Sequence, residues 1–178
     1  MINQKKSNFE KENNQKLFLS KKVFKQLILA HHPNCDKFKN HTFKIGRYHF
    51  CIGCFIGYPT AIIGIIVIRM LNLPNLLDSI YFIIIALSLI ATFIFSPLNL
   101  TKLKIIKIIQ KFLIGLGSSF LFWWIWILPN PLHINIIIFF LIFGPLMMLL
   151  NAYHAYGFYK ACKKCEYTMN WNSCPGFK

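Results

Sequence analysis

The segment FLIGLGSSFLFWWIWILPNPLHINIIIFFLIFGPLMMLLNAYHAYGFY, residues 112–159, contains no Asp, Glu, Lys or Arg. A transmembrane helix needs roughly 20 mostly apolar residues, so a charge-free run of this length suits two crossings of a bilayer. Pro129-Asn130-Pro131 divides the run, because proline interrupts a continuous helix and Asn-Pro is typical of turns. The sequence therefore predicts two spans, over about residues 106–128 and 134–157.

Two earlier stretches have the same apolar character. One covers about residues 50–70 and contains Arg69 near its end, and the other covers about residues 79–100, between Asp78 and Lys102. A soluble domain of 178 residues, 56% of them hydrophobic, could not bury four such segments at once. Inside hydrocarbon the backbone must satisfy its own hydrogen bonds, so even the Ile-rich run 136–141 is expected to be helical. The predicted fold is an all-α integral membrane protein with four transmembrane helices within residues 50–159.

The distribution of Lys and Arg predicts the orientation of these spans. Eleven of the 20 Lys and Arg residues precede the first span, four lie between residues 102 and 111, and four lie between residues 160 and 178. The other two connections together contain only Arg69. Cytoplasmic loops are enriched in Lys and Arg, and a four-span chain has its two termini and its middle connection on one side. We therefore expect a multi-pass protein of the cell membrane with both termini in the cytoplasm.

Residues 1–30 are predicted to form a basic polar arm that ends in a short amphipathic helix, Lys21–Ala30. Such a helix typically lies at a membrane surface, and the net charge of +15 favours anionic lipids of the cytoplasmic leaflet as partners. The chain shows no aromatic and basic pattern of a nucleic-acid-binding module, so no nucleic-acid partner is expected. The start of the sequence also lacks the apolar core of a signal peptide.

Cysteine and histidine residues gather in two segments that flank the predicted membrane domain. Residues 31–54 contain three cysteines and four of the six histidines, and the Cys-rich tail, residues 160–178, contains the other three cysteines. Four crossings of the membrane would bring both segments to the cytoplasmic surface. We therefore expect a cytoplasmic Cys/His-rich cluster that is formed by both segments.

Each segment contains a Cys-x-x-Cys pair, Cys51/Cys54 in the first and Cys162/Cys165 in the second. Two such pairs can supply the four thiolates of a tetrahedral zinc site, and a closed four-sulfur site is typical of structural zinc. Zinc is therefore the expected cofactor, and it would join the two cytoplasmic segments. Mixed Cys/His sets also bind zinc, so the secondary candidate ligands are Cys35, Cys174, His31, His32, His41 and His49. Thiol redox chemistry and inert buried cysteines are the alternatives for the same residues.

The segment from His31 to Gly64 also resembles an uncharacterised family of small prokaryotic multi-span membrane proteins. Members carry a His-rich or Cys-His start, a short loop with Phe and Gly, and a Cys-x-x-Cys motif that enters the first span. The matching residues here are His32, Pro33, Phe43, Gly46, Cys51, Cys54 and Gly57. This chain has Gly53 and Ile56 where the family usually has Arg and Gly. The resemblance implies a membrane location and a metal-binding type of motif, with no established activity.

Three functions fit these features. The first is a membrane protein whose structural zinc site serves docking or assembly with a protein partner. The second is a membrane thiol-disulfide oxidoreductase that uses the two Cys-x-x-Cys pairs, although disulfide formation belongs outside the cytoplasm. The third is a transporter of metal ions or small solutes, but the spans lack the Asp and Glu that a conduction path usually needs. With five acidic residues and no catalytic constellation, the sequence favours a protein that is not an enzyme.

Overall fold

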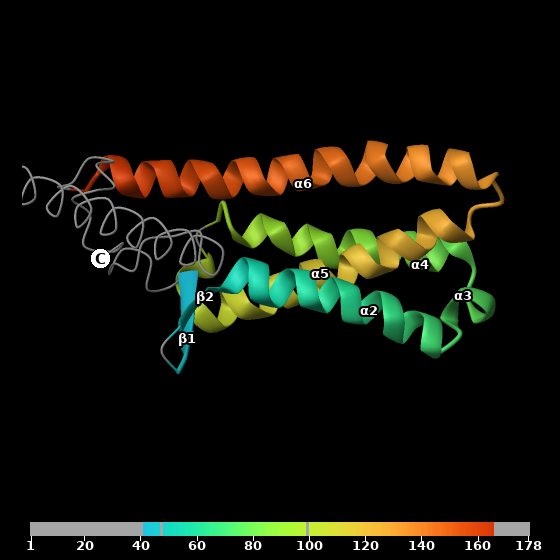
Figure 1. Ribbon diagram of the computed structural model, residues 1–178, viewed down its shortest axis with the longest axis horizontal. Coiled ribbons are helices and arrows are strands. Elements are labelled where there is room, and N and C mark those ends of the chain that lie inside the picture. The colour runs from blue at the N-terminus through green and yellow to red at the C-terminus, as the bar shows by residue number, and fades with distance from the viewer. Residues whose placement is uncertain (1–40, 47, 99, 166–178) are drawn as a thin grey trace, which may run out of the picture. The chain divides into compact units, whose positions relative to one another are not determined.

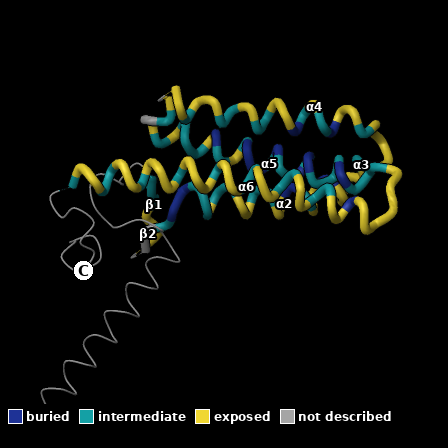
Figure 2. The backbone as a smooth tube through the Cα atoms, turned by 90° about the horizontal axis from the view of Figure 1, so that it is seen from above, coloured by how far each residue is buried: buried dark blue, intermediate teal, exposed yellow. Residues whose placement is uncertain are grey.

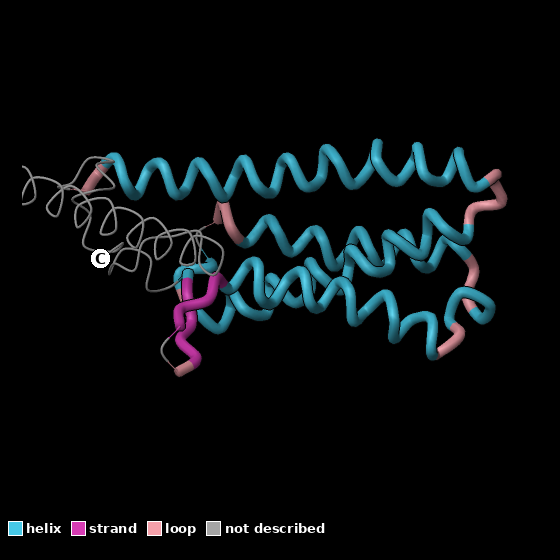
Figure 3. The backbone as a smooth tube through the Cα atoms, viewed as in Figure 1, coloured by secondary structure: helices cyan, strands magenta, loops and turns pink. Residues whose placement is uncertain are grey.

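The computed structural model describes residues 41–46, 48–98 and 100–165 (Figure 1). This part of the chain is mostly helical, as predicted, but it also contains a two-stranded hairpin that was not predicted (Figure 3). The elements in chain order are β1 (Thr42–Ile45), β2 (Tyr48–Cys51), η2 (Gly53–Gly57), α2 (Tyr58–Met70), α3 (Leu73–Leu76), α4 (Ser79–Ile90), η3 (Ala91–Phe95), η4 (Leu100–Lys102), α5 (Lys104–Ile127) and α6 (Leu132–Lys163). The helix expected at Lys21–Ala30 lies outside the described residues.

The chain divides into two compact units. The larger unit is Ile52–Tyr159 and covers nearly all of the predicted membrane domain. The smaller unit includes the described residues 41–51, which form the hairpin, and the described residues 160–165 at the end of α6. The described parts of the two cysteine-containing segments therefore belong mainly to the smaller unit.

Among the described residues, three helical segments are long and apolar enough to cross a membrane, namely Gly53–Met70, Lys104–Ile127 and Leu132–Lys163. The first span was predicted to begin at residue 50, but Phe50 and Cys51 pair with β1 and belong to a strand instead. The span predicted over residues 79–100 is helical over Ser79–Phe95 and is shorter than the other three. It ends just before Pro97, whose ring cannot continue a helical hydrogen-bond ladder.

Helix α5 is the central element of the larger unit, with α2 and α4 packed against it (Figure 1). Figure 2 shows that its backbone carries much of the buried part of the structure. Ile114, Leu121 and Ile125 are buried on this helix, together with two of its glycines. The core of the unit therefore follows α5 along most of its length.

The backbones of α2 and α5 approach each other closely because both helices have small residues at the contact. A Cβ atom added to Gly115 would lie 2.5 Å from the carbonyl oxygen of Gly57 and 3.0 Å from the Cβ of Thr60. One turn further along, the Ser119 hydroxyl donates a hydrogen bond of 2.9 Å to the carbonyl of Ala61. Small residues and side-chain hydrogen bonds are the usual means of joining helices in lipid. These small residues therefore hold α2 and α5 together.

The pairs of contacting residues show the relative directions of the helices. From the start of α5 toward its end, the successive pairs with the η2–α2 segment are Gly57 with Gly115, Ala61 with Ser119 and Ile65 with Trp123. Both residue numbers rise together, so α2 and α5 run in the same direction. Between α5 and the α4–η3 segment, one residue number rises as the other falls. Phe82 contacts Phe120, whereas Thr92, further along the chain, contacts the earlier residue Gln110. This segment therefore runs antiparallel to α5.

A buried amide joins the end of the α4–η3 segment to α5. Gln110 is 1% exposed, and its Nε2 donates hydrogen bonds to the carbonyls of Thr92, at 2.9 Å, and Phe93, at 3.3 Å. Its side chain also bonds the hydroxyl of Ser96. The Gln110 amide thus adds a side-chain donor from α5 to the end of the α4–η3 segment, where the Phe93 carbonyl also accepts the backbone N–H of Ser96 at 2.9 Å.

Helix α6 packs less closely than α5 does. In the most apolar 18-residue stretch of each helix, 6% of the residues of α6 are buried, compared with 33% of those of α5. It is joined to the end of α5 by Phe139, whose ring contacts those of Phe122 and Trp126, and by Asn135, whose amide donates to the carbonyl of Leu128. Most of the remaining α6 surface is apolar and exposed, as expected for a helix that faces lipid.

The close contact at Gly115 makes a prediction for stability. We expect Gly115→Ala to lower the free energy of unfolding by about 1–3 kcal/mol, because the new methyl group meets backbone atoms that can move only together with α2. The matched control is Gly157→Ala on α6, where an added Cβ meets nothing within 4 Å. Thermal unfolding of the detergent-solubilised variants measures both effects. Equal midpoints for the two variants would contradict the close packing of α2 on α5.

Candidate functional site

The hairpin places the first Cys-x-x-Cys pair at the entry to α2. Strand β1 is followed by Gly46, which has φ +58°, a conformation that glycine adopts without strain. The rings of Phe43 and Phe50 lie opposite each other in the register and stack, with centroids 5.7 Å apart. Cys51 is the last residue of β2 and pairs with Thr42.

Cys51 and Cys54 occupy different backbone settings. Cys51 ends the strand and is 1% exposed, whereas Cys54 lies in the π-helical turn η2 and is half-exposed. A π-helical turn is rare, and where it occurs it often lies at a functional site. The first cysteine pair therefore spans the transition from strand to helix, where the chain changes its backbone hydrogen-bonding pattern.

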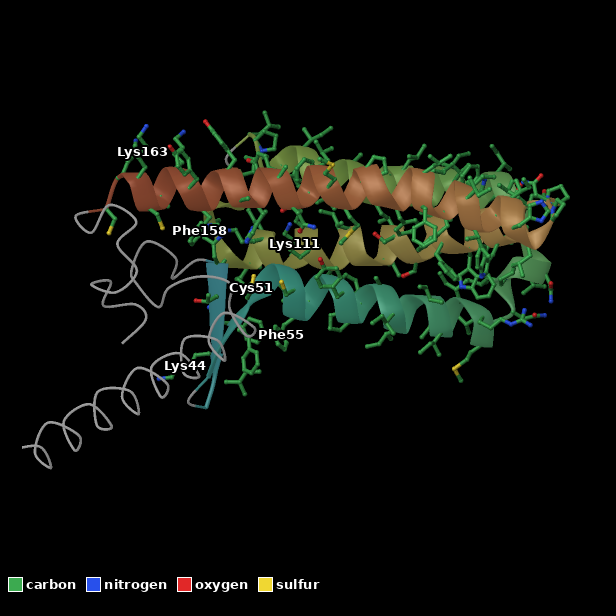
Figure 4. All side chains as sticks on the ribbon, turned by 45° about the horizontal axis from the view of Figure 1, so that its top comes forward. Lys44, Cys51, Phe55, Lys111, Phe158 and Lys163 are labelled. Carbon is green, nitrogen blue, oxygen red and sulfur yellow. The ribbon has the colours of Figure 1, made fainter. Side chains whose placement is uncertain are left out.

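The second pair lies at the end of α6. Cys162 is in the last turn of the helix, and the backbone N–H of Cys165 donates a hydrogen bond of 3.1 Å to the carbonyl of Cys162. This bond closes a tight turn that contains Lys163 and Lys164, and both cysteines are half-exposed. Figure 4 labels Lys163 at this end of α6 and Cys51 at the end of β2.

Three of the four primary candidates belong to one compact unit. The smaller unit includes Cys51, Cys162 and Cys165, whereas Cys54 is counted with the larger unit. Within residues 41–46, 48–98 and 100–165, no group of three or more His, Cys, Asp or Glu side chains is arranged to hold a metal ion. Both cysteine-containing segments are thus assigned to one unit, and the described residues do not form a coordination site.

The secondary candidates divide between described and undescribed residues. His41 immediately precedes β1, and His49 is in β2 opposite Lys44. Four further candidates lie outside the described residues, namely His31, His32, Cys35 and Cys174.

Sequence reasoning missed two features of this part of the molecule. The hairpin could have been found from the runs TFKI and YHFC, which are rich in β-branched and aromatic residues and flank Gly46 and Arg47. The buried Gln110 had no comparable signal, because it stands between lysines at the predicted cytoplasmic end of a span, where an exposed polar residue is ordinary.

Comparisons of the chain with family models, with curated proteins and with solved structures found no match. The resemblance of residues 31–64 to a family of small membrane proteins therefore stays a prediction. Any proposal about function has to come from the residues and the geometry of this chain.

The unequal exposure of the cysteines can be measured. In protein treated with a chelator, we expect Cys51 to react with a maleimide about tenfold more slowly than Cys54, Cys162 and Cys165, because a buried thiol is inaccessible to the reagent. Mass spectrometry of the peptides after short labelling times gives the four rates. Unfolded protein is the control and should label evenly. A Cys51 rate equal to the others in the folded protein would contradict its burial at the end of β2.

Proposed function

We propose that the protein is a four-span membrane protein whose cytoplasmic Cys51, Cys54, Cys162 and Cys165 bind a structural zinc ion. The ion would tie the segment before the first span to the segment after the last one. The protein would then present a rigid, basic cytoplasmic surface for docking to anionic lipid and to a protein partner. The observation that carries the proposal is the presence of a Cys-x-x-Cys pair at each end of the membrane domain.

The direction of the helices supports four crossings. Helices α2 and α5 are both long and apolar enough to span, and they run in the same direction along each other. A chain that crosses twice in one direction must return across the membrane between the two crossings. The α4–η3 segment lies between them in sequence and runs antiparallel to α5. It is therefore the natural return crossing.

The α4–η3 segment is long enough for this role despite its few residues. Its α-helical part, Ser79–Ile90, is about 18 Å long at 1.5 Å per residue. Its 3₁₀ part, Ala91–Phe95, adds about 10 Å, because a 3₁₀ helix rises about 2.0 Å per residue. The sum of about 28 Å approaches the roughly 30 Å of hydrocarbon in a bilayer.

The charges support a cytoplasmic location for both cysteine pairs. Four crossings place the N-terminus, the connection around residues 102–111 and the C-terminus on one side, and these segments contain 19 of the 20 Lys and Arg residues, all except Arg69. The cytoplasm keeps thiols reduced, which favours metal binding over disulfide exchange at Cys-x-x-Cys. The membership of Cys51, Cys162 and Cys165 in one compact unit agrees with this arrangement.

The topology is tested by labelling single introduced cysteines. Leu103, before α5, and Leu132, at the start of α6, are 65% and 69% exposed. We expect a membrane-impermeant maleimide to label Leu132→Cys in intact cells, and to label Leu103→Cys only after permeabilisation. The unmodified protein is the control, since all its cysteines are expected to lie inside. Labelling of Leu103→Cys from outside, with Leu132→Cys protected, would contradict the proposed topology, because either α4 does not cross or the four spans have the opposite orientation.

The zinc proposal is tested by the metal content of the purified protein. We expect about one zinc per chain, and loss of this zinc in both Cys51→Ser and Cys162→Ser, because a four-sulfur site that loses one thiolate binds much more weakly. Lys163→Gln is the matched control, since it changes the same turn as Cys162 and keeps all thiols.

Two results would contradict this proposal. Absence of zinc in the unmodified protein would do so, above all if the cysteine pairs cycled between thiol and disulfide with a quinone analogue, which is the behaviour of the oxidoreductase alternative. Zinc that survives in both serine variants would show that other residues bind it.

A further inference from the structure

Helix α6 has two asparagines in different environments. Asn135, near its start, is buried, accepts a hydrogen bond from the Asn130 amide and donates one to the carbonyl of Leu128. Asn151, about four turns further on, is exposed, and its side chain forms no hydrogen bond with any of the described residues. One amide is thus satisfied by neighbouring residues, whereas the other has no hydrogen-bond partner among the residues that the structure describes.

Asn151 lies within the hydrocarbon layer when α6 spans the membrane. The charge-free part of this helix, residues 132–159, is about 42 Å long, whereas the hydrocarbon layer is about 30 Å thick. A layer centred on this part includes residues from about 136 to about 155. An amide at that depth has no water to bond, and an unpaired polar group in hydrocarbon is costly.

Asn151 belongs to a stripe of exposed residues on α6. The members alternate at spacings of four and three residues, and they are Ile137, Leu141, Gly144, Met148, Asn151 and Ala155. This seven-residue repeat is the pattern by which two parallel helices pack along one seam. A Cβ atom added to Gly144 would meet nothing within 4 Å, so there is room at the stripe for another helix.

We propose that this stripe is the interface of a homodimer in which Asn151 pairs with Asn151 of the partner subunit. Copies of a membrane protein share one orientation, so two α6 helices related by a twofold axis run parallel. Each residue of the stripe then faces its own counterpart at the same depth. A carboxamide both donates and accepts hydrogen bonds, so two asparagines that face each other can each satisfy the other.

A second copy fits the stripe better than other occupants do. Lipid tails can cover its apolar members, but they cannot form a hydrogen bond with the amide. A different protein would need a polar group at the matching depth, whereas twofold symmetry supplies one at once. A polar Asn on a helical seam also fixes the register of the two helices. The proposal rests on α6 crossing the membrane and is independent of the zinc site.

Two adjacent positions on α6 test the interface. Met148 belongs to the stripe, and Leu149 lies about 100° further round the helix at the same depth; they are 75% and 59% exposed. We expect Met148→Cys to give a disulfide-linked dimer in oxidised native membranes, well above the background of the unmodified protein. Leu149→Cys should stay at that background. Equal yields at both positions, no dimer at either, or a link to another protein would overturn the proposal.

The role of the amide is tested in the Met148→Cys background. We expect Asn151→Leu to weaken dimerisation about tenfold, measured from the dependence of the linked fraction on protein density in the membrane. Asn151→Gln retains an amide and should preserve most of the dimer. Unchanged dimerisation in Asn151→Leu would overturn the pairing. Zinc content and thermal unfolding, measured on the same samples, separate this result from a failure of the metal site or of folding.

Discussion

The close backbone approach of α5 to its neighbours is the constraint on which the larger unit depends. Gly115 faces α2, and Gly117 faces α4, where an added Cβ would lie 2.9 Å from the Cβ of Leu89. In lipid the tails are as apolar as the side chains, so burial of apolar surface does little to hold helices together. Close packing and hydrogen bonds to backbone carbonyls have to do this, as Ser119 and Trp123 do toward α2.

The same constraint explains where the polar side chains of the membrane domain lie. Gln110 donates to the Thr92 and Phe93 carbonyls at the end of the α4–η3 segment, and Asn135 donates to the Leu128 carbonyl at the end of α5. Each amide thus lies beside the end of a helical segment and finds its partner on the backbone there. Asn151 differs because it lies in the middle of a continuous helix, on a face that no described element covers. The proposed pairing with a second copy would give this amide the partner that the described residues do not supply.

The candidate site combines motifs that are visible in the sequence with backbone settings that are not. Both Cys-x-x-Cys pairs can be recognised from spacing alone, and the structure adds that one bridges a strand and a π-helical turn while the other closes a tight turn. The sequence does not show that Cys51 is buried, because burial depends on how the hairpin packs.

The sequence by itself determined that the chain contains long apolar helices, roughly where three of them lie, and that charged segments flank them. The length of an apolar segment and the positions of Lys and Arg can be read directly from the sequence. In the hydrocarbon of a membrane, a sufficiently apolar segment has to be helical, because its backbone must form all of its own hydrogen bonds. Only the tertiary structure decided that α2 and α5 run side by side in the same direction, that Gln110 is buried, and that Asn151 is left exposed. These features depend on which helix packs against each side chain. That packing is determined by contacts between residues far apart in the chain, which cannot be read from local sequence.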